Sequence, residues 1–353
     1  MANAFINGAG CISAQKSFDG IFSEALALDE TLNVLPVAEP SYGDYIASSA
    51  SRRMSKGVKN ATVAAALAMR EAGLDTPDAI ITGTGIGCIA DSDKFLDAII
   101  ADNEQFLTPT SFIQSTHNTF GASIALGLKC KVYNFNYVQA AVSFESALLD
   151  TLMMLEEKTA YSILTGGVDE LNDRTVALFK LAGFIKQDWE GHYCVLGSRT
   201  TGAVFSQGAT FFVIEDRQRD STYAKLLDVK LVNRLSVDEV EMAAHVFLKA
   251  NNLKVSDVDA VVLGLNGDTA YDMYYQELTD KTFAAIPQVY YKHLSGEYNT
   301  ASAFGLWIAA NVIREQRIPG ILQVNDLSKT EYRNILLYNQ YRGADHSFTL
   351  ISR

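Results

Sequence analysis

The stretch YVQAAVSFESALLD, residues 137–150, passes directly from an apolar, β-prone segment into a helical pattern. This order of strand, bend and helix is typical of a nucleophile turn, in which a strand delivers a reactive side chain to the first turn of a helix. The residue at the bend is Ala141, whose methyl group cannot attack a substrate. The stretch therefore predicts a strand–helix junction of an α/β protein and raises the question of whether a catalytic group has been lost from it.

Strand-like and helical segments alternate on both sides of this junction. Because strands that are apolar throughout are covered on both faces, this alternation predicts a layered α/β fold. The pattern restarts after a polar link at 216–221, which predicts two similar halves, residues 1–216 and 217–353. Helices are expected over 60–74, 94–106, 143–158, 236–251 and 301–316, and strands over 4–8, 11–13, 79–88, 131–138, 160–171, 203–216, 225–232, 258–268, 335–341 and 347–353.

The composition is that of a globular protein. The chain has 353 residues, of which 48% are hydrophobic, and a net charge of −12. No apolar run reaches the roughly 18–20 residues that a membrane span needs. The first fifteen residues lack the basic and apolar regions of a signal peptide, so we expect a cytoplasmic location. The acidic balance and the absence of a long basic run argue against binding to nucleic acids or anionic membranes.

Short motifs for cofactors and metals are absent from the sequence. The glycines of GTGIGC, residues 83–88, do not have the GxGxxG spacing of a dinucleotide site, and neither GxxxxGK[ST] nor GxSxG occurs. The four cysteines have no CxxC spacing and the five histidines no HExxH spacing. We therefore expect no cofactor and no metal ion.

Several pieces of the chain, taken in order, resemble the β-ketoacyl-ACP synthases of the thiolase-like fold. The pieces are FINGAGCIS (5–13), GTGIGC (83–88), LTPTSFIQSTHNTFGASIALGLKC (107–130), ILTGGVDEL (163–171) and FSQGATFFVIED (205–216). Each is weak alone, but their order and spacing are those of the family over most of the chain. The resemblance implies an α-β-α-β-α layered fold of two similar halves with mixed five-stranded sheets.

In that family a cysteine lies on the strand–helix turn, where the helix N-terminus stabilises its thiolate. Counting back from the Gly166-Gly167 pair with the family's usual spacing places Ala141 at this position and Ser143 two residues on. A shift of two residues would place Gln139 there instead, which is similar to the glutamine of chain-length-factor subunits. Neither alanine nor glutamine can be acylated.

The family also uses two histidines to polarise the thioester carbonyl and promote decarboxylation. The resemblance places Gly264, in VVLGLNGDTAYD (261–272), at the first histidine, and Glu297, in KHLSGEYNTASAFG (292–305), at the second. The family's lysine is retained as Lys292, whereas His293 comes too early to occupy the position of the second histidine. Where the family has a glycine-rich gate loop, NQYRGADHS (339–347) keeps only Gly343.

These four departures together imply a catalytically inactive, chain-length-factor-like subunit that pairs with an active ketosynthase and shapes the tunnel for a growing chain. A decarboxylase of the glutamine type is excluded, because that chemistry still needs the histidines. The alternative is an active 3-oxoacyl-ACP synthase or acyltransferase with non-standard residues, for which Ser143, Glu145 and Glu297 are the available groups. No residue near Ser143 in the sequence would activate it.

The resemblance implies a heterodimer with a ketosynthase, or a homodimer, and an acyl carrier protein that docks mainly on the partner because both it and this chain are acidic. The short second half is similar to the compact synthases of aryl-polyene and flexirubin-type pathways. Candidate tunnel or interface residues are Asn118, Phe120, Phe135, Tyr137, Gln139 and Ser143. For any one of these residues, an ordinary role in the protein core is the alternative.

Overall fold

A ten-stranded mixed sheet organises the chain in the computed structural model, which describes residues 3–16, 28–187 and 192–353. The strands are β1 (Phe5–Ile12), β2 (Ala79–Gly83), β3 (Tyr133–Tyr137), β4 (Ser162–Asp169), β5 (Gly208–Glu215), β6 (Ala224–Asn233), β7 (Ala260–Leu263), β8 (Gln288–Tyr290), β9 (Asn334–Tyr341) and β10 (Asp345–Ser352). The α-helices are α1 (Ser48–Ser51), α2 (Lys56–Ala72), α3 (Ile89–Ala101), α4 (Pro109–Gln114), α5 (Thr119–Gly127), α6 (Ser143–Glu157), α7 (Asp173–Leu181), α8 (Glu239–Ala250), α9 (Met273–Glu277), α10 (Lys292–Ser295) and α11 (Ser302–Glu315).

The strand order is repeated in the two halves of the sheet. Strands β3, β2 and β4 are parallel neighbours, followed by antiparallel β5 and β1. Strands β8, β7 and β9 are likewise parallel neighbours, followed by antiparallel β10 and β6. The predicted layered α/β fold with two similar halves is therefore confirmed. The expected pair of five-stranded sheets is joined into one, because β1 and β6 pair at Phe5–Lys225 and Ile6–Ala224.

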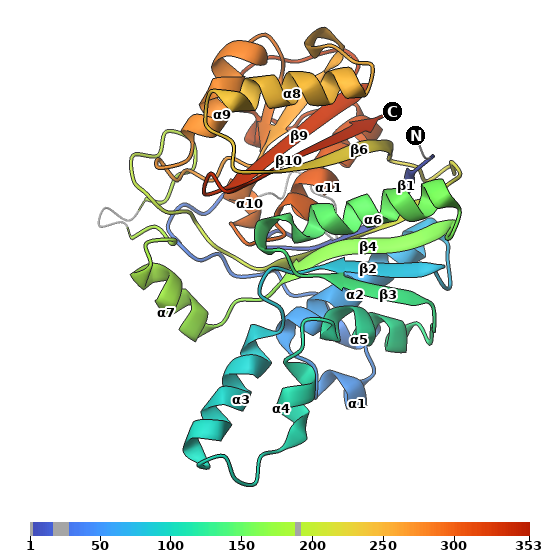
Figure 1. Cartoon of the computed structure of the whole chain (residues 1–353), viewed down its shortest axis with the longest axis vertical. Helices are drawn as coiled ribbons and strands as arrows, with labels where there is room; N and C mark the ends of the chain where they lie inside the picture. Colours follow the sequence, from blue (N-terminus) through green and yellow to red (C-terminus); the bar gives the residue numbers. More distant parts are fainter. Residues whose placement is uncertain (1–2, 17–27, 188–191) are drawn as a thin grey trace.

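The helices form three layers around these strands (Figure 1). Helices α2 and α5 cover one outer face, α8 covers the opposite outer face, and α6 and α11 lie between the two halves. Helix α11 is buried from Ser302 to Ile313, as its small and apolar sequence predicts for a helix with protein on all sides. Helices α3 and α4 project from the body of the molecule beside the α5 layer.

Helix α2 shows how local sequence sets the ends of an element. The Ser55 hydroxyl accepts a hydrogen bond from the Val58 amide at the N-terminus, and Gly73 adopts the left-handed conformation (φ 65°) at the C-terminus. The predicted end at this glycine is confirmed, whereas the helix begins four residues earlier than expected, at Lys56. The short elements β8, α4, α7 and α9 were not predicted, because segments of three to nine residues carry little periodic signal.

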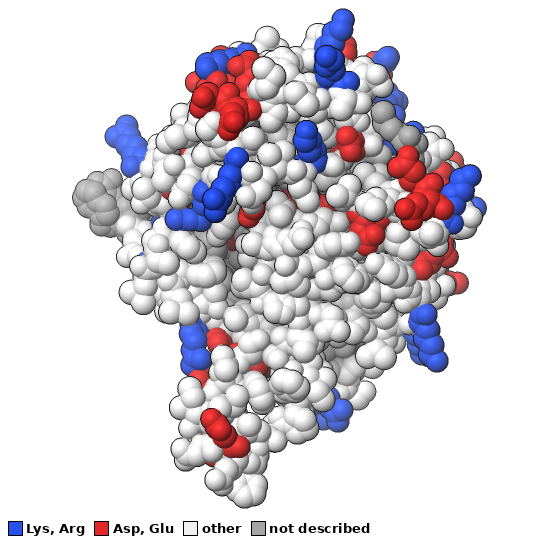
Figure 2. Space-filling view, viewed as in Figure 1, with Lys and Arg blue, Asp and Glu red and all other residues white. Residues whose placement is uncertain are grey.

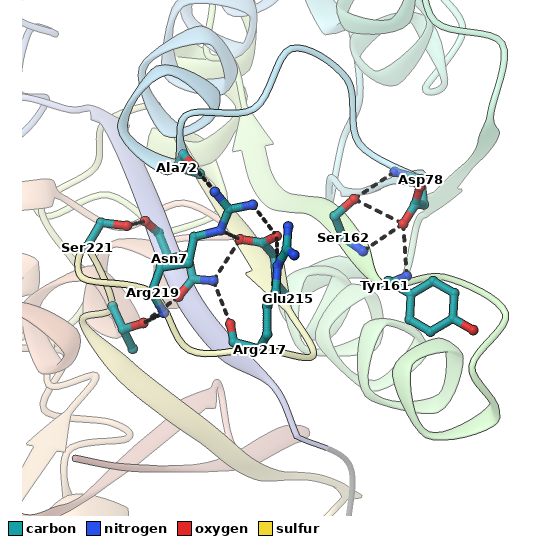
Figure 3. Close-up of polar contacts among 10 residues, drawn as sticks. Asn7, Ala72, Asp78, Tyr161, Ser162, Glu215, Arg217, Arg219 and Ser221 are labelled. Atoms are coloured by element: carbon teal, nitrogen blue, oxygen red, sulfur yellow. Dashed lines mark hydrogen bonds and ion pairs between the residues drawn. The ribbon is translucent and has the colours of Figure 1, made fainter.

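Polar side chains fix the connection between the halves (Figure 3). Glu215, at the end of β5, accepts hydrogen bonds from Asn7 Nδ2 at 2.7 Å and from Arg219 at 2.7 Å. Arg219 also donates to the Ala72 carbonyl, and the Ser221 hydroxyl donates to the Asn7 carbonyl. The segment between β5 and β6, which contains the predicted division at residues 216 and 217, is thus held against β1 and the end of α2.

A second polar contact in the same view aligns the beginnings of β2 and β4 (Figure 3). Asp78 Oδ2 accepts hydrogen bonds from the Tyr161 and Ser162 amides, both at 2.9 Å, and from the Ser162 hydroxyl at 3.0 Å.

No helix in the described part of the chain combines the length and apolarity that crossing a bilayer requires.

Candidate functional site

The strand–helix turn at Ala141 has the predicted sequence of elements. Strand β3 ends at Tyr137, a 3-10 turn (η3) spans Ala140–Val142, and α6 begins at Ser143. Ala141 is buried at this bend, and only 2% of its surface is exposed. Ala140 has a φ of +47°, a conformation that costs a non-glycine residue of order 1–3 kcal/mol. The turn therefore keeps a strained backbone although it presents only a methyl group.

Hydrogen bonds of Ser143 hold this strained turn. Its hydroxyl accepts from the Gln139 amide at 2.8 Å and lies 2.7 Å from the Ala140 carbonyl and 3.0 Å from the Thr84 carbonyl. The end of β2 abuts the same residue, because a Cβ on Gly83 would lie 2.5 Å from the Ser143 carbonyl oxygen. These partners are backbone groups, which cannot act as a base, so the geometry gives Ser143 a structural role and no activated hydroxyl.

A buried ion pair occupies the position predicted to replace the second histidine. Lys292 Nζ lies 2.7 Å from Glu297 Oε2, and the two side chains are 1% and 3% exposed. The same carboxylate oxygen accepts a hydrogen bond from Asn266 Nδ2 at 2.7 Å. Two donors therefore converge on one carboxylate in the interior, where an unpaired charge would be strongly unfavourable. Lys292, Glu297 and Asn266 together form the Glu297 cluster.

The structure separates Gly264 from this cluster. Gly264 follows β7, and a Cβ there would lie 2.1 Å from Asn339 Oδ1, so the backbone at this position admits only glycine without displacing Asn339. Asn266, two residues further on, reaches Glu297. Sequence reasoning did not single out Asn266, although the Asn266-Gly267 pair directly after a strand was the available signal.

A second carboxyl group lies inside the first turn of α6. Glu145 is fully buried, and its Oε1 accepts a hydrogen bond from the Ser347 hydroxyl of β10 at 2.9 Å. Burial raises the pKa of Glu145. The hydroxyl groups of Ser302 and Ser347 and the charge of Lys292 act in the opposite direction and lower it. The carboxyl therefore joins α6 to the second half of the molecule, and its burial keeps it from solvent.

Residues 339–347, where the sequence predicts that the family's gate loop is lost, contain a tight hairpin turn between β9 and β10. Strands β9 and β10 pair up to Tyr341 and Asp345, so only three residues connect them. Arg342 and Gly343 both have positive φ, 52° and 66°. The Gly343 amide donates to Gln340 Oε1 at 2.9 Å, which commits that N–H to the hairpin instead of an oxyanion.

A small cavity lies beside Asp169 and Tyr298. It has a volume of about 10 Å³, which is at the lower limit for a single water molecule. Its walls come from both halves of the molecule, and an acyl group does not fit in it. The lining residues are Ile86, Asp169, Glu170, Leu171, Phe179, Phe205, Ser206, Tyr298, Asn299 and Tyr341.

His293 lies away from the Glu297 cluster, as its position in the sequence predicts. Its ring stacks on Tyr290 with 3.7 Å between the centroids, and it lines a separate cavity of about 350 Å³ with Gln15 and Pro36. Only 6% of its surface is exposed. Burial lowers the pKa of His293 to about 3, so the ring is neutral in the folded protein at ordinary pH.

This shift predicts a loss of stability in acid. Below the ordinary histidine pKa of about 6.5 the unfolded chain takes up a proton that folded His293 does not, so the free energy of unfolding falls as the pH drops from about 6.5 towards 3. The contribution at pH 5 is about 2 kcal/mol. His293→Phe, which keeps the stacked ring, should remove this part of the pH dependence in urea unfolding at pH 7.5 and 5. His245→Phe, at an exposed position, should leave the pH dependence unchanged. If the free energy of unfolding changed equally between pH 7.5 and 5 in all three proteins, His293 would not be its source.

The candidate interface residues differ in exposure. Phe120 is completely buried against the α2 layer and is a core residue in the isolated chain. Asn118 is exposed at the N-terminus of α5, and Phe135 is 46% exposed on β3. Tyr137 is half-buried and its ring meets that of Phe135 edge-on, with 5.0 Å between the centroids. The exposed candidates thus lie at the β3 edge of the sheet.

This edge belongs to a broad uncharged face. Figure 2 shows mainly uncharged side chains over β3 and α5, whereas acidic side chains lie over part of α6 and beside its right-hand end in the same view. β3 pairs with β2 alone, at one end of the strand order, so its outer side has no hydrogen-bonded neighbour among the described strands. The exposed large apolar side chains of these segments are Leu126, Tyr133, Phe135, Val138, Leu149 and Met153.

No group of three or more histidine, cysteine, aspartate or glutamate side chains within the described ranges is arranged to hold a metal ion. No known protein-family model and no curated protein matches the sequence.

Solved structures match along the whole chain. The ishigamide ketosynthase/chain length factor has 17% sequence identity and a TM-score of 0.82, with 99% of both chains covered. A β-ketoacyl synthase from Burkholderia phymatum has 16% identity and a TM-score of 0.77, with both chains covered completely. A ketosynthase in complex with its chain length factor from Xenorhabdus doucetiae has 14% identity and a TM-score of 0.76, with 99% of this chain and 98% of that chain covered.

Proposed function

We propose that this chain, whose fold is that of the ketosynthases and chain length factors, is a catalytically inactive subunit that pairs with an active β-ketoacyl-ACP synthase. The observation that carries the proposal is the buried pair of Lys292 and Glu297 at the position of a catalytic histidine. A carboxylate held there by a lysine would oppose the negative charge of an enolate instead of stabilising it. Ala141 at the turn supplies no nucleophile.

Asn266 completes this interpretation of the site. Asn266 fits the position of the first histidine better than Gly264 does, because Asn266 contacts Glu297 and Gly264 lies against Asn339. An amide can donate a hydrogen bond but cannot exchange a proton at neutral pH. On this assignment an amide, a carboxylate and a methyl group replace the two imidazoles and the thiol.

The exposed candidate residues suggest how this subunit would act on a substrate chain. We propose that it shapes the tunnel from outside, by walling the acyl pocket of the partner across the shared interface. Asn118, Phe135 and Gln139 are the wall candidates whose exposure fits this role.

The β3 edge is the proposed contact with the ketosynthase. An exposed edge strand offers unpaired backbone groups to a strand of a partner, and aromatic side chains dominate many interfaces. Tyr133 and Phe135 are stacked, with 6.1 Å between their ring centroids, and are 45% and 46% exposed. An acyl carrier protein would then dock mainly on the partner, because this chain carries a net charge of −12.

Phe135→Glu should weaken the heterodimer by about 2–4 kcal/mol, because it places a charge in the apolar centre of the proposed interface. Native mass spectrometry of the co-expressed subunits would measure the loss. Leu181→Glu is the matched control, since Leu181 is 85% exposed on α7, away from β3. Equal retention of the partner by the two variants would exclude β3 from the interface.

Catalytic inactivity can be tested on the isolated chain. We expect no mass increase after incubation with an acyl thioester probe, and no release of carbon dioxide from malonyl carrier protein. The co-expressed cysteine-containing ketosynthase should become acylated in the same assay, which serves as the positive control. Acylation or elongation by the isolated chain would instead support an active synthase or acyltransferase with non-standard residues.

We further propose a role in polyketide or fatty-acid-like biosynthesis, in the cytoplasm, with an aryl-polyene or flexirubin-type product. The likeness in fold to a ketosynthase in complex with its chain length factor supports the biosynthetic role. The similarity of the second half to the compact synthases of these pathways suggests the product class. Product analysis after reconstitution with the partner and carrier protein should give a conjugated polyene. A saturated fatty acid as the sole product would contradict the pathway.

A further inference from the structure

A second cavity lies at the carboxyl end of β7, apart from the Glu297 cluster. Its volume of about 320 Å³ is at the lower end of the range for small-molecule sites, about 300–1,000 Å³. Strand β7 lies between two parallel neighbours, β8 and β9, and ligands commonly bind beyond the carboxyl ends of such strands. The lining residues are Val195, Leu196, Gly197, Ser198, Leu263, Leu265, Thr269, Asp272, Met273, Tyr275, Gln276, Thr279 and Val324.

Asp272 is the unusual member of this lining. It is 92% buried, since 8% of its surface is exposed, yet its Oδ1 accepts no hydrogen bond from any residue that the structure describes. A buried oxygen without a partner costs about 1–3 kcal/mol, so such atoms are rare in folded proteins. Asp272 lines the cavity, so a ligand that donates to its carboxyl group would offset part of this cost.

The charges around Asp272 favour a ligand without charge. Burial raises the pKa of Asp272 to about 7, with Lys186 acting in the opposite direction and Asp268 in the same direction. Lys186 Nζ contacts the Ser198 hydroxyl at 2.7 Å and the Gly267 carbonyl at 2.6 Å, which places a positive charge close to this cavity. Lys186 and the more distant Lys292 would repel a cation, while Asp268 and Asp272 would repel an anion.

We propose that this cavity binds a small, uncharged molecule with a short aliphatic body and a hydroxyl or primary amide group, which donates a hydrogen bond to the Asp272 carboxyl group. The apolar walls from Leu263, Leu265 and Val324 accommodate the aliphatic part. The polar group lies on the side of Asp272 and Thr269. This inference is independent of the proposed pairing with a ketosynthase.

Six-carbon compounds with different head groups provide the test. Hexan-1-ol and hexanamide should bind the isolated chain, whereas hexanoate and hexylammonium should bind at least about tenfold more weakly, the loss expected for one hydrogen bond and an unfavourable charge. The readout is NMR of ¹³C-methyl methionine. The Met273 signal should shift on titration, because Met273 lines the cavity, while the signal of Met242, on α8, should remain in place.

Two variants separate this site from general apolar binding. Met273→Trp should block the cavity, because Met273 is 44% exposed at its edge, whereas Met242→Trp, at a 65% exposed position outside it, should not affect binding. Asp272→Leu should weaken hexanamide binding about tenfold, and Asp272→Asn, which keeps an acceptor, should weaken it less. Equal binding of all four compounds, an unmoved Met273 signal, or unchanged affinity in Met273→Trp would overturn the proposal.

Discussion

Lys292→Met should lower the free energy of unfolding by about 3–5 kcal/mol, the cost of leaving the Glu297 carboxylate buried without its counter-ion. The pair is nearly inaccessible to solvent, with 2.7 Å between Lys292 Nζ and Glu297 Oε2, so water cannot replace the lysine without rearrangement. Among the side-chain donors in the part of the chain that the structure describes, Asn266 would remain as the one partner of the carboxylate. Urea unfolding followed by circular dichroism measures the change, which is a large part of the stability of a typical domain.

The double variant Lys292→Met, Glu297→Gln is the decisive companion. It removes both charges, and the carbonyl of the introduced amide can still accept from Asn266. We expect it to recover stability to within about 2 kcal/mol of the original protein, because replacing a whole buried pair is far less costly than breaking it. Lys249→Met, at an exposed position of α8, is the control for losing a lysine. A double variant no more stable than Lys292→Met would show that the pair is not the source of the effect.

Asp169→Ala should have an effect of similar size, about 3–5 kcal/mol, because it leaves several buried donors without an acceptor. Asp169 Oδ1 accepts from the Gly85 amide at 2.8 Å and the Thr84 hydroxyl at 3.1 Å. Its Oδ2 accepts from the amide and the hydroxyl of Thr300, both at 2.9 Å. One carboxyl group thus ties the loop after β2 to the segment before α11, which belong to different halves of the chain.

Hydrogen exchange would localise this effect beyond a global unfolding midpoint. In Asp169→Ala the amides of Gly85 and Thr300 should lose protection first, because both donate to the deleted carboxyl group. Asp169→Asn should be intermediate, since one oxygen remains as an acceptor while the new NH₂ group faces donors. Asp75→Asn, at an exposed position, should be neutral. Unchanged protection at both amides would contradict the bridging role.

Much of the fold follows from local patterns. The helix that ends at Gly73 and the buried α11 were predictable, because glycine at a helix end and small or apolar residues on all sides are local signals. The turn at Ala141 was also predictable from a β-prone run followed by helical periodicity. Strand β8, with three residues, carried no such signal. The division at residue 217 and the equivalence of Ala141 or Gln139 to the nucleophile remain predictions.

The sequence alone determined which chemical groups are available: an alanine at the bend, a glutamate five residues after a lysine, and no histidine at either of the two positions where the family resemblance expects one. Only the tertiary structure decided which groups meet. Asn266 and Glu297 are 31 residues apart, and Asp169 and Thr300 are 131 apart, yet each pair is within hydrogen-bonding distance. Such contacts depend on how the two halves pack against α6 and α11, and no local pattern encodes that packing. For the same reason, the hydrogen bond between Asn266 and Glu297 and the unpartnered oxygen of Asp272 became visible only in the folded chain.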